Sequence, residues 1–206
     1  FPRRLSGNAI QVYDLAYDVA MGTRWSFYRG DSSHKNNAPK VISGLREREM
    51  KAIRLSWKAV SSDMKTNGTA FFIKFFEIHP AYLDYFPAFK DKTSEQLHRS
   101  LILQAHGISV MYSFTTLVEN LNDEAYFTKF MKQSVRSHHN RGVSLKQYEE
   151  MFQVLIVFLE EKLGNSFNEY TLHSWERFAE RFSAAVEKVR AQEKLGPCGQ
   201  TPKKGP

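Results

Sequence analysis

Residues 101–114 read LILQAHGISVMYSF, and this stretch indicates the fold more directly than any other part of the chain. Leu103, His106, Val110 and Phe114 follow one another at spacings of three and four, so on a helix they share one face. The stretch therefore predicts an α-helix with a histidine inside its apolar face. A histidine in this setting is more often a hydrogen-bonded core residue than a metal ligand, because a neutral imidazole can be buried without a metal.

The same helical spacing extends outward over most of the chain and predicts an all-α fold. It recurs over residues 45–63, 70–79, 93–121, 144–162 and 168–192. Alternating patterns typical of strands are missing. We expect a break between the first two segments near Thr66, Asn67 and Gly68, where the apolar spacing lapses.

Local signals mark the ends of two of these helices. Capping boxes, in which Ser or Thr is followed three residues later by Gln, begin the segments 93–121 and 144–162. Gly164 is expected to end the second of them in a left-handed conformation, which glycine adopts readily.

Charge divides the chain into a central domain and two basic flanks. Residues 1–43 carry six Lys or Arg and three Asp, a charge of +3, and residues 194–206 carry three lysines, so 7 − 3 − 3 leaves about +1 for residues 44–193. We expect an N-terminal extension over 1–43, partly helical or irregular, with a short helix near 10–19 and a linker over 32–43. A helical domain over 44–193 and a disordered basic tail follow. The central domain lacks the basic face of a nucleic-acid-binding module.

Composition also bounds the cellular setting. We find no apolar run of about 18 residues and no order typical of a secretory signal in residues 1–30, so a transmembrane segment is not expected. The single cysteine, Cys198, cannot form a disulfide within the chain. That composition favours a reducing compartment, and we expect a cytoplasmic protein.

A pair of histidines closes the stretch KQSVRSHHNRGVS at residues 132–144. Neighbouring helical residues point about 100° apart, so His138 and His139 cannot readily bind the same small ion. One of them is expected to face inward and the other solvent. The sequence has no cysteine cluster, no HExxH motif and no paired carboxylates at ligand spacing, which leaves zinc and calcium sites with little support.

These features occur in an order that resembles the globin family over roughly residues 45–192. The ordered set is Trp57, Pro80, YFPAF at 85–89, Ala105-His106-Gly107 with Val110, and Ser137-His138. Trp57 and Phe86 are 86 − 57 = 29 residues apart, and Pro80 precedes Phe86 by six, as in globins. The resemblance implies a globin fold, a three-on-three helical sandwich, with haem b (iron protoporphyrin IX) as the cofactor.

The resemblance also implies a role for each matching residue. His138 would be the proximal iron ligand, with its other ring N–H restrained by a backbone carbonyl or by Ser137. His106 would lie on the distal side of the same iron. Phe86 would stack on the porphyrin, and Phe89 would pack beside it.

Further positions of the match surround the two histidines. Gly68 and Gly107 would mark a close crossing of two helices. Gly142-Val143 matches the turn that closes under the haem, which favours His138 over His139 as the ligand. The remaining residues implied to bind the cofactor are Phe72, Leu103, Val110, Phe114, Arg141, Val143, Phe152 and Leu155. Any single apolar member could equally be plain core, and Arg141 either pairs with a haem propionate or is a solvated surface charge.

Two observations favour iron held by both histidines. Phe72, at the distal wall position, is bulky and cannot donate a hydrogen bond. His106 and His138 are 138 − 106 = 32 residues apart, a separation similar to neuroglobin and three longer than in vertebrate myoglobin. The chain thus resembles the hexacoordinate, neuroglobin-like globins of invertebrates or neurons, although His106 could instead stabilise bound gas by a hydrogen bond.

The resemblance implies a function in binding diatomic gases such as dioxygen, nitric oxide or carbon monoxide, in responding to redox state, or in both. Iron with two histidine ligands favours a sensor or signalling globin, with a reductase or a signalling protein as partner. The alternatives are a simple oxygen storage or transport globin, a haem enzyme (nitric oxide dioxygenase, nitrite reductase or peroxidase-like), and a haem-free interaction module. An enzyme is not the first expectation, because the sequence has no flavin or dinucleotide motif to supply electrons.

Overall fold

The structure is a computed structural model that describes residues 44–196. Within that range it consists of α-helices and short 3₁₀ helices joined by turns, with no strand, so the expected all-α fold is confirmed. The predictions for residues 1–43, including the helix near 10–19 and the linker over 32–43, lie outside the described residues. Cys198 and most of the predicted tail also lie outside them.

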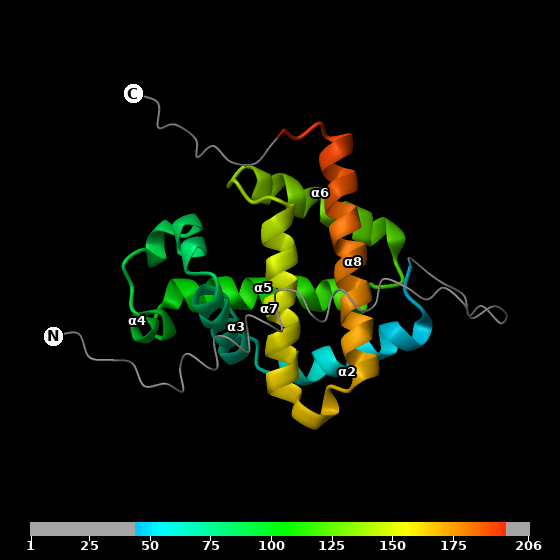
Figure 1. The fold of residues 1–206 in the computed structure, drawn as a ribbon, viewed down its shortest axis with the longest axis horizontal. Helices are drawn as coiled ribbons and strands as arrows, with labels where there is room; N and C mark the ends of the chain where they lie inside the picture. Colours follow the sequence, from blue (N-terminus) through cyan, green and yellow to red (C-terminus); the bar gives the residue numbers. More distant parts are fainter. Residues whose placement is uncertain (1–43, 197–206) are drawn as a thin grey trace.

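The helices follow the predicted segments closely. In chain order they are α2 (Glu47–Ser61), α3 (Met64–Ile78), η1 (Pro80–Tyr85), η2 (Pro87–Phe89), α4 (Ser94–His98), α5 (Leu101–Glu119), α6 (Glu124–His139), α7 (Leu145–Leu163), η3 (Gly164–Ser166) and α8 (Glu169–Gln192). Figure 1 shows α7 and α8 side by side, with α2 crossing α8 toward one end and α6 crossing it toward the other. The helices that carry the two candidate histidines, α5 and α6, both lie behind the α7–α8 pair in this view.

The predicted capping boxes form as expected. Thr93 Oγ1 accepts a hydrogen bond from the Gln96 N–H at 3.2 Å, and the Gln96 side chain accepts from the Thr93 N–H at 2.9 Å. At the start of α7, the Gln147 side chain accepts from the Ser144 N–H at 2.8 Å. Gly164 ends α7 with φ +50° and ψ −128°, so φ is positive as predicted but the backbone is not in the left-handed helical region.

Two helix boundaries differ from the prediction because capping side chains outweigh apolar spacing. The break expected at Thr66–Gly68 lies at Ser62–Asp63, where the Asp63 carboxylate accepts from the Thr66 N–H at 3.1 Å and begins α3. The segment 93–121 is two helices, because Ser100 Oγ accepts from the Leu103 N–H at 3.3 Å and begins α5 anew.

Two tryptophans join α2 to the rest of the core. Trp57 and Trp175 are 2% and 0% exposed, and their rings lie 5.9 Å apart. The Trp57 indole N–H donates to Thr115 of α5, and the Trp175 indole N–H donates to Ser56 of α2, both at 2.9 Å. Because both buried donors are satisfied, the rings can anchor α2 against α5 and α8 without leaving a polar group unpaired.

Helix α5 corrects one sequence-based expectation. Among the described residues, it is long and apolar enough to cross a membrane by length and composition, with a mean hydropathy of 1.3, so the statement that no such run exists was wrong. In the fold this helix packs against α3 and α2. Its buried positions include Leu103, Gly107, Met111 and Phe114, whereas Leu101, Ile102, Ile108 and Tyr112 are exposed, so burial explains only part of its apolar character.

Candidate functional site

The close helix crossing predicted at two glycines is present. A Cβ atom added to Gly68 would lie 2.6 Å from the carbonyl carbon of Gly107, and one added to Gly107 would lie 2.7 Å from the carbonyl carbon of Gly68. Real Cβ atoms do not approach backbone atoms this closely, so α3 and α5 can touch only with glycine at both positions. This contact sets where α5 places the histidine next to Gly107.

His106 of α5 lies between two aromatic rings. Its ring centroid is 4.6 Å from that of Phe72 on α3 and 5.2 Å from that of Phe86. Phe72 is buried, with 6% of its surface exposed. Within residues 44–196 the His106 ring makes no hydrogen bond, so aromatic packing alone holds it.

Phe86 belongs to a cluster of aromatic rings that starts at the end of α3. Its ring stacks on Phe89 at 5.4 Å and meets Phe76 edge-on at 5.2 Å. Phe89 is fully buried, whereas Phe86 remains only partly buried. The predicted contact between Phe86 and Phe89 is therefore present, and the Phe86 ring is supported from behind.

His138 of α6 is held by hydrogen bonds as well as packing. Its Nδ1 lies 2.8 Å from the backbone carbonyl oxygen of Ser134, one turn earlier. A carbonyl can only accept, so Nδ1 carries the proton and Nε2 keeps its lone pair for a ligand bond. Of the two restraints predicted, the backbone carbonyl is confirmed. The alternative restraint by Ser137 was wrong, because the Ser137 hydroxyl accepts a hydrogen bond from Arg141 Nη1 at 3.3 Å.

Sequence reasoning missed two residues beside His138. The Ser134 hydroxyl lies 3.5 Å from His138 Nδ1 and 3.3 Å from the hydroxyl of Tyr148 on α7. The Tyr148 ring lies 5.4 Å from the His138 ring and is buried. Ser134 could have been found from its place four residues before His138, but nothing in the sequence pattern points to Tyr148.

The chain turns back beneath the end of α6, as the Gly142-Val143 motif predicted. Gly142 has φ +83° and donates its N–H to the His139 carbonyl at 2.9 Å, and the Val143 N–H donates to the His138 carbonyl at 3.0 Å. His138 and His139 are both half-buried at this covered helix end.

The electrostatics of the two histidines are linked. Burial lowers the pKa of His106, and the nearby charges of His138 and Arg141 lower it further. Burial also lowers the pKa of His138, while its hydrogen bond to Ser134 opposes that shift and the Arg141 charge adds to it. Both lowered pKa values favour the neutral imidazole over the imidazolium.

The other residues predicted to bind the cofactor divide into core and partly buried positions. Leu103, Phe114, Phe152 and Leu155 are buried, whereas Val110 and Val143 are partly buried against the core. Phe114 and Phe152 lie 5.7 Å apart, but they also pack on Trp57 and on Phe178 and Phe182 respectively. The plain-core alternative therefore describes the contacts of these two aromatic residues well.

The assembled side chains fit haem better than a bare metal ion. Two neutral imidazoles with apolar aromatic neighbours match a flat apolar macrocycle whose metal takes nitrogen ligands. Nowhere in residues 44–196 do three or more His, Cys, Asp or Glu side chains gather closely enough to hold an ion. A site for zinc or calcium thus lacks ligands in the described part of the chain.

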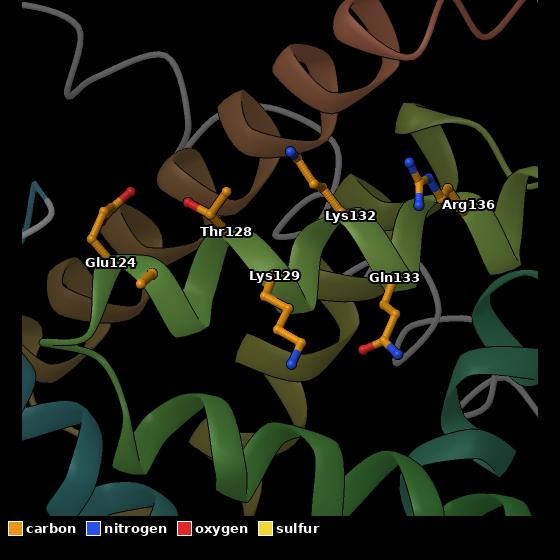
Figure 2. A pocket seen from close by; sticks show the side chains of 7 residues that line it. Glu124, Thr128, Lys129, Lys132, Gln133 and Arg136 are labelled. Atoms are coloured by element: carbon orange, nitrogen blue, oxygen red, sulfur yellow. The ribbon is translucent and has the colours of Figure 1, made fainter.

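A separate hollow of about 730 Å³ lies along α6 and does not include either histidine. Among its lining residues are Glu124, Thr128, Lys132 and Arg136. Figure 2 shows Thr128 and Lys132 on one side of the helix and Lys129 and Gln133 on the other. These are polar surface side chains, so this hollow is not the histidine site.

Comparisons with known proteins agree on one family. A family model described as "Globin" matches residues 69–186. The chain is 26% identical over 137 residues to "Globin" of Nerita albicilla, covering 66% of this chain and 87% of the relative. It is also 26% identical over 139 residues to "Hemoglobin-3" of Phacoides pectinatus, covering 67% and 90%, and 25% identical over 138 residues to "Globin-2 B chain" of Anadara inaequivalvis, covering 67% and 89%.

Proposed function

This chain belongs to the globin family, and on that premise we propose that it is a bis-histidine haem globin that binds diatomic gases and acts as a sensor or signalling protein. His138 would hold the iron of haem b on the proximal side, and His106 on the distal side. Haem b supplies the metal at which dioxygen, nitric oxide or carbon monoxide binds. The relatives named globin and haemoglobin support a binding function ahead of a primary enzymatic one.

The observation that carries the proposal is the oriented imidazole of His138, whose Nδ1 is held by the Ser134 carbonyl. His138 comes from α6, and His106 comes from α5, where its ring lies against Phe72 and Phe86. The hydrogen bond from Nδ1 to the Ser134 carbonyl leaves Nε2 of His138 able to bind a metal. Two imidazoles that share one apolar site, with one ring already oriented, suit an iron held from both sides.

The distal surroundings support a histidine that can bind and leave. Phe72 and Phe86 pack on the His106 ring and offer no hydrogen-bond donor to a gas. Because the imidazole would have to move away before a gas could bind, the apparent gas affinity would be the intrinsic affinity multiplied by the fraction of molecules in which it has done so. A reduced and tunable affinity suits signalling better than storage, and a reductase or signalling protein is the partner we propose.

The absorption spectrum of the purified protein tests both parts of the proposal. A Soret band is expected, and the ferrous protein without gas should show sharp low-spin α and β bands. His106→Leu should turn this spectrum high-spin. His98→Leu, at an exposed histidine of α4, is the matched control and should leave it unchanged.

The possible failures are distinct. Absence of a Soret band would contradict haem binding altogether. A Soret band with a high-spin ferrous spectrum in the unaltered protein would contradict the role of His106 and favour an oxygen storage or transport globin.

We also propose a cytoplasmic location, which the single cysteine of the sequence supports.

A further inference from the structure

We propose that Ser134 and Tyr148 are positioning residues that orient the imidazole of His138 and strengthen it as a ligand. This inference rests on the proposed binding of haem through His138. It concerns the side chains behind that ring, at Nδ1, and adds a hydroxyl pair from two helices to the backbone carbonyl that already holds the ring.

The three side chains form a continuous chain of polar contacts. The Tyr148 hydroxyl on α7 lies 3.3 Å from the Ser134 hydroxyl on α6, which lies 3.5 Å from His138 Nδ1. The Ser134 carbonyl oxygen lies closer to Nδ1, at 2.8 Å, and is the main acceptor. One residue thus offers Nδ1 both a backbone and a side-chain oxygen.

The Ser134 hydroxyl is held in an unusual direction for a helical serine. Serine within a helix commonly donates to the carbonyl four residues earlier, as Ser113 does to Ser109 at 2.9 Å. The Ser134 hydroxyl instead meets Tyr148 and Nδ1. Tyr148 therefore selects the Ser134 rotamer in which the hydroxyl oxygen lies beside the ring nitrogen.

Tyr148 is itself rigidly placed. Only 6% of its surface is exposed, and its ring packs 5.6 Å from Phe182 of α8 and 5.4 Å from His138. A buried tyrosine hydroxyl needs hydrogen-bonding partners, since burying it without one is costly. The contact with Ser134 provides one and connects α7 to the ring on α6.

The physical effect follows from sharing the Nδ1 proton. A second acceptor near Nδ1–H draws the proton outward and increases electron density on the ring, which makes Nε2 a stronger donor to iron. A stronger donor stabilises the ferric form relative to the ferrous form. Removing the Ser134 hydroxyl, or the Tyr148 hydroxyl that directs it, should weaken this effect in the same direction.

The test compares Ser134→Ala, Tyr148→Phe and the double variant in the haem-loaded full chain. Three quantities are measured: the ferric/ferrous midpoint potential, the rate of haem transfer to an acceptor protein, and the NMR shift of the His138 Nδ1 proton in the ferrous low-spin state. Ser134→Ala should raise the potential, speed haem loss up to about tenfold and move the proton resonance. Tyr148→Phe should act in the same direction.

The double variant gives the decisive comparison. If Tyr148 acts through Ser134, the double variant should match Ser134→Ala, because the tyrosine hydroxyl then has nothing to direct. Ser113→Ala is the matched control and should change none of the three quantities. The inference would be overturned if Tyr148→Phe had the same effect in the unaltered protein and in Ser134→Ala. It would also be overturned if neither single variant had an effect.

Failure of the proposed function would look different. In that case the unaltered protein would lack a Soret band, and the inference would be overturned together with the proposed function. If the variants show a normal haem spectrum and an unchanged potential, rate of haem loss and Nδ1 proton resonance, only the role of Ser134 and Tyr148 is contradicted.

Discussion

The two histidines of the site are held in contrasting ways. His106 is packed between the rings of Phe72 and Phe86 and makes no hydrogen bond within residues 44–196. His138 donates Nδ1–H to the Ser134 carbonyl at 2.8 Å and has a second oxygen within 3.5 Å. Ring packing is non-directional, whereas a hydrogen bond fixes orientation.

This difference teaches which ring can move. Displacing His106 changes aromatic contacts but breaks no described hydrogen bond. Displacing His138 breaks its bond to Ser134 and leaves the carbonyl of a helical turn without that partner. In the proposed site the His138 ring would therefore stay in place and the His106 ring would exchange, and the following changes test that contrast.

The largest effect is expected from His138→Gly. Without the oriented imidazole the protein should lose haem during purification and show no Soret band. The control is His139→Gln, which should retain haem with an unchanged spectrum, since the assignment rests on His138. Haem retention in His138→Gly, or its loss in His139→Gln, would reverse the proximal assignment.

The next largest effect is expected from Gly68→Ala. The new Cβ would lie 2.6 Å from the Gly107 carbonyl carbon, so α3 and α5 must separate. Overpacking of this kind costs about 1–3 kcal/mol of unfolding free energy, measurable by urea denaturation. The shift of α5 should also weaken the low-spin ferrous bands.

Gly196→Ala is the matched control for that substitution. A Cβ at Gly196 would meet no atom within 4 Å, so neither the urea midpoint nor the spectrum should change. Equal stability of the two glycine variants would show that the crossing does not need glycine, and that another contact places His106.

A smaller effect is expected from Phe72→Leu. Loss of the ring 4.6 Å from His106 should loosen the imidazole and speed gas binding. The increase should be roughly two- to tenfold, since an aromatic pair contributes about 0.5–1.5 kcal/mol. Rapid mixing of the ferrous protein with carbon monoxide measures it.

Phe158→Leu serves as the control, because Phe158 packs on Phe71 of α3 and, among the described residues, has no ring contact with Phe72 or His106. Its rate should match that of the unaltered protein. If both leucine variants bind gas at the same raised rate, a general loosening of α3 explains the result and the specific hold on His106 does not.

The smallest effect concerns His79, a histidine in an aromatic setting like that of His106 but outside the site. Its ring stacks on Tyr82 at 5.2 Å, and burial, with a lesser effect of Lys146, lowers its pKa. A lowered folded pKa means that stability is present above the unfolded value near 6.5 and is lost as pH falls. The unaltered protein should therefore lose more stability than His79→Phe when the pH falls from 7.5 to 5.

Urea midpoints at the two pH values measure that difference. Because His79 is only partly buried, solvent screening keeps the effect small. A pH dependence identical in both proteins would show that aromatic packing around a histidine does not by itself disfavour its protonation, and would weaken the same reasoning for His106.

Much of the fold could be predicted because its signals are local. Apolar residues at spacings of three and four indicated the helices, and capping boxes at Thr93 and Ser144 placed two of their starts within a residue. The break at Ser100 was missed because a serine cap inside an apolar stretch looks like an ordinary helical residue. The break at Asp63 was misplaced since Gly68 suggested a turn, while its true role is contact with Gly107.

In the candidate site, too, some features follow from local sequence signals and others from contacts between helices. The amino-acid sequence by itself determined an all-α chain, the two glycines and the ordered histidines and phenylalanines that resemble a globin, because these depend on residue type and spacing. What holds each imidazole depends on contacts between helices, which spacing along the chain does not reveal. Ser134 and Tyr148 are 14 residues apart on different helices, and only the folded arrangement of α6 and α7 brings their hydroxyls to within 3.3 Å behind His138.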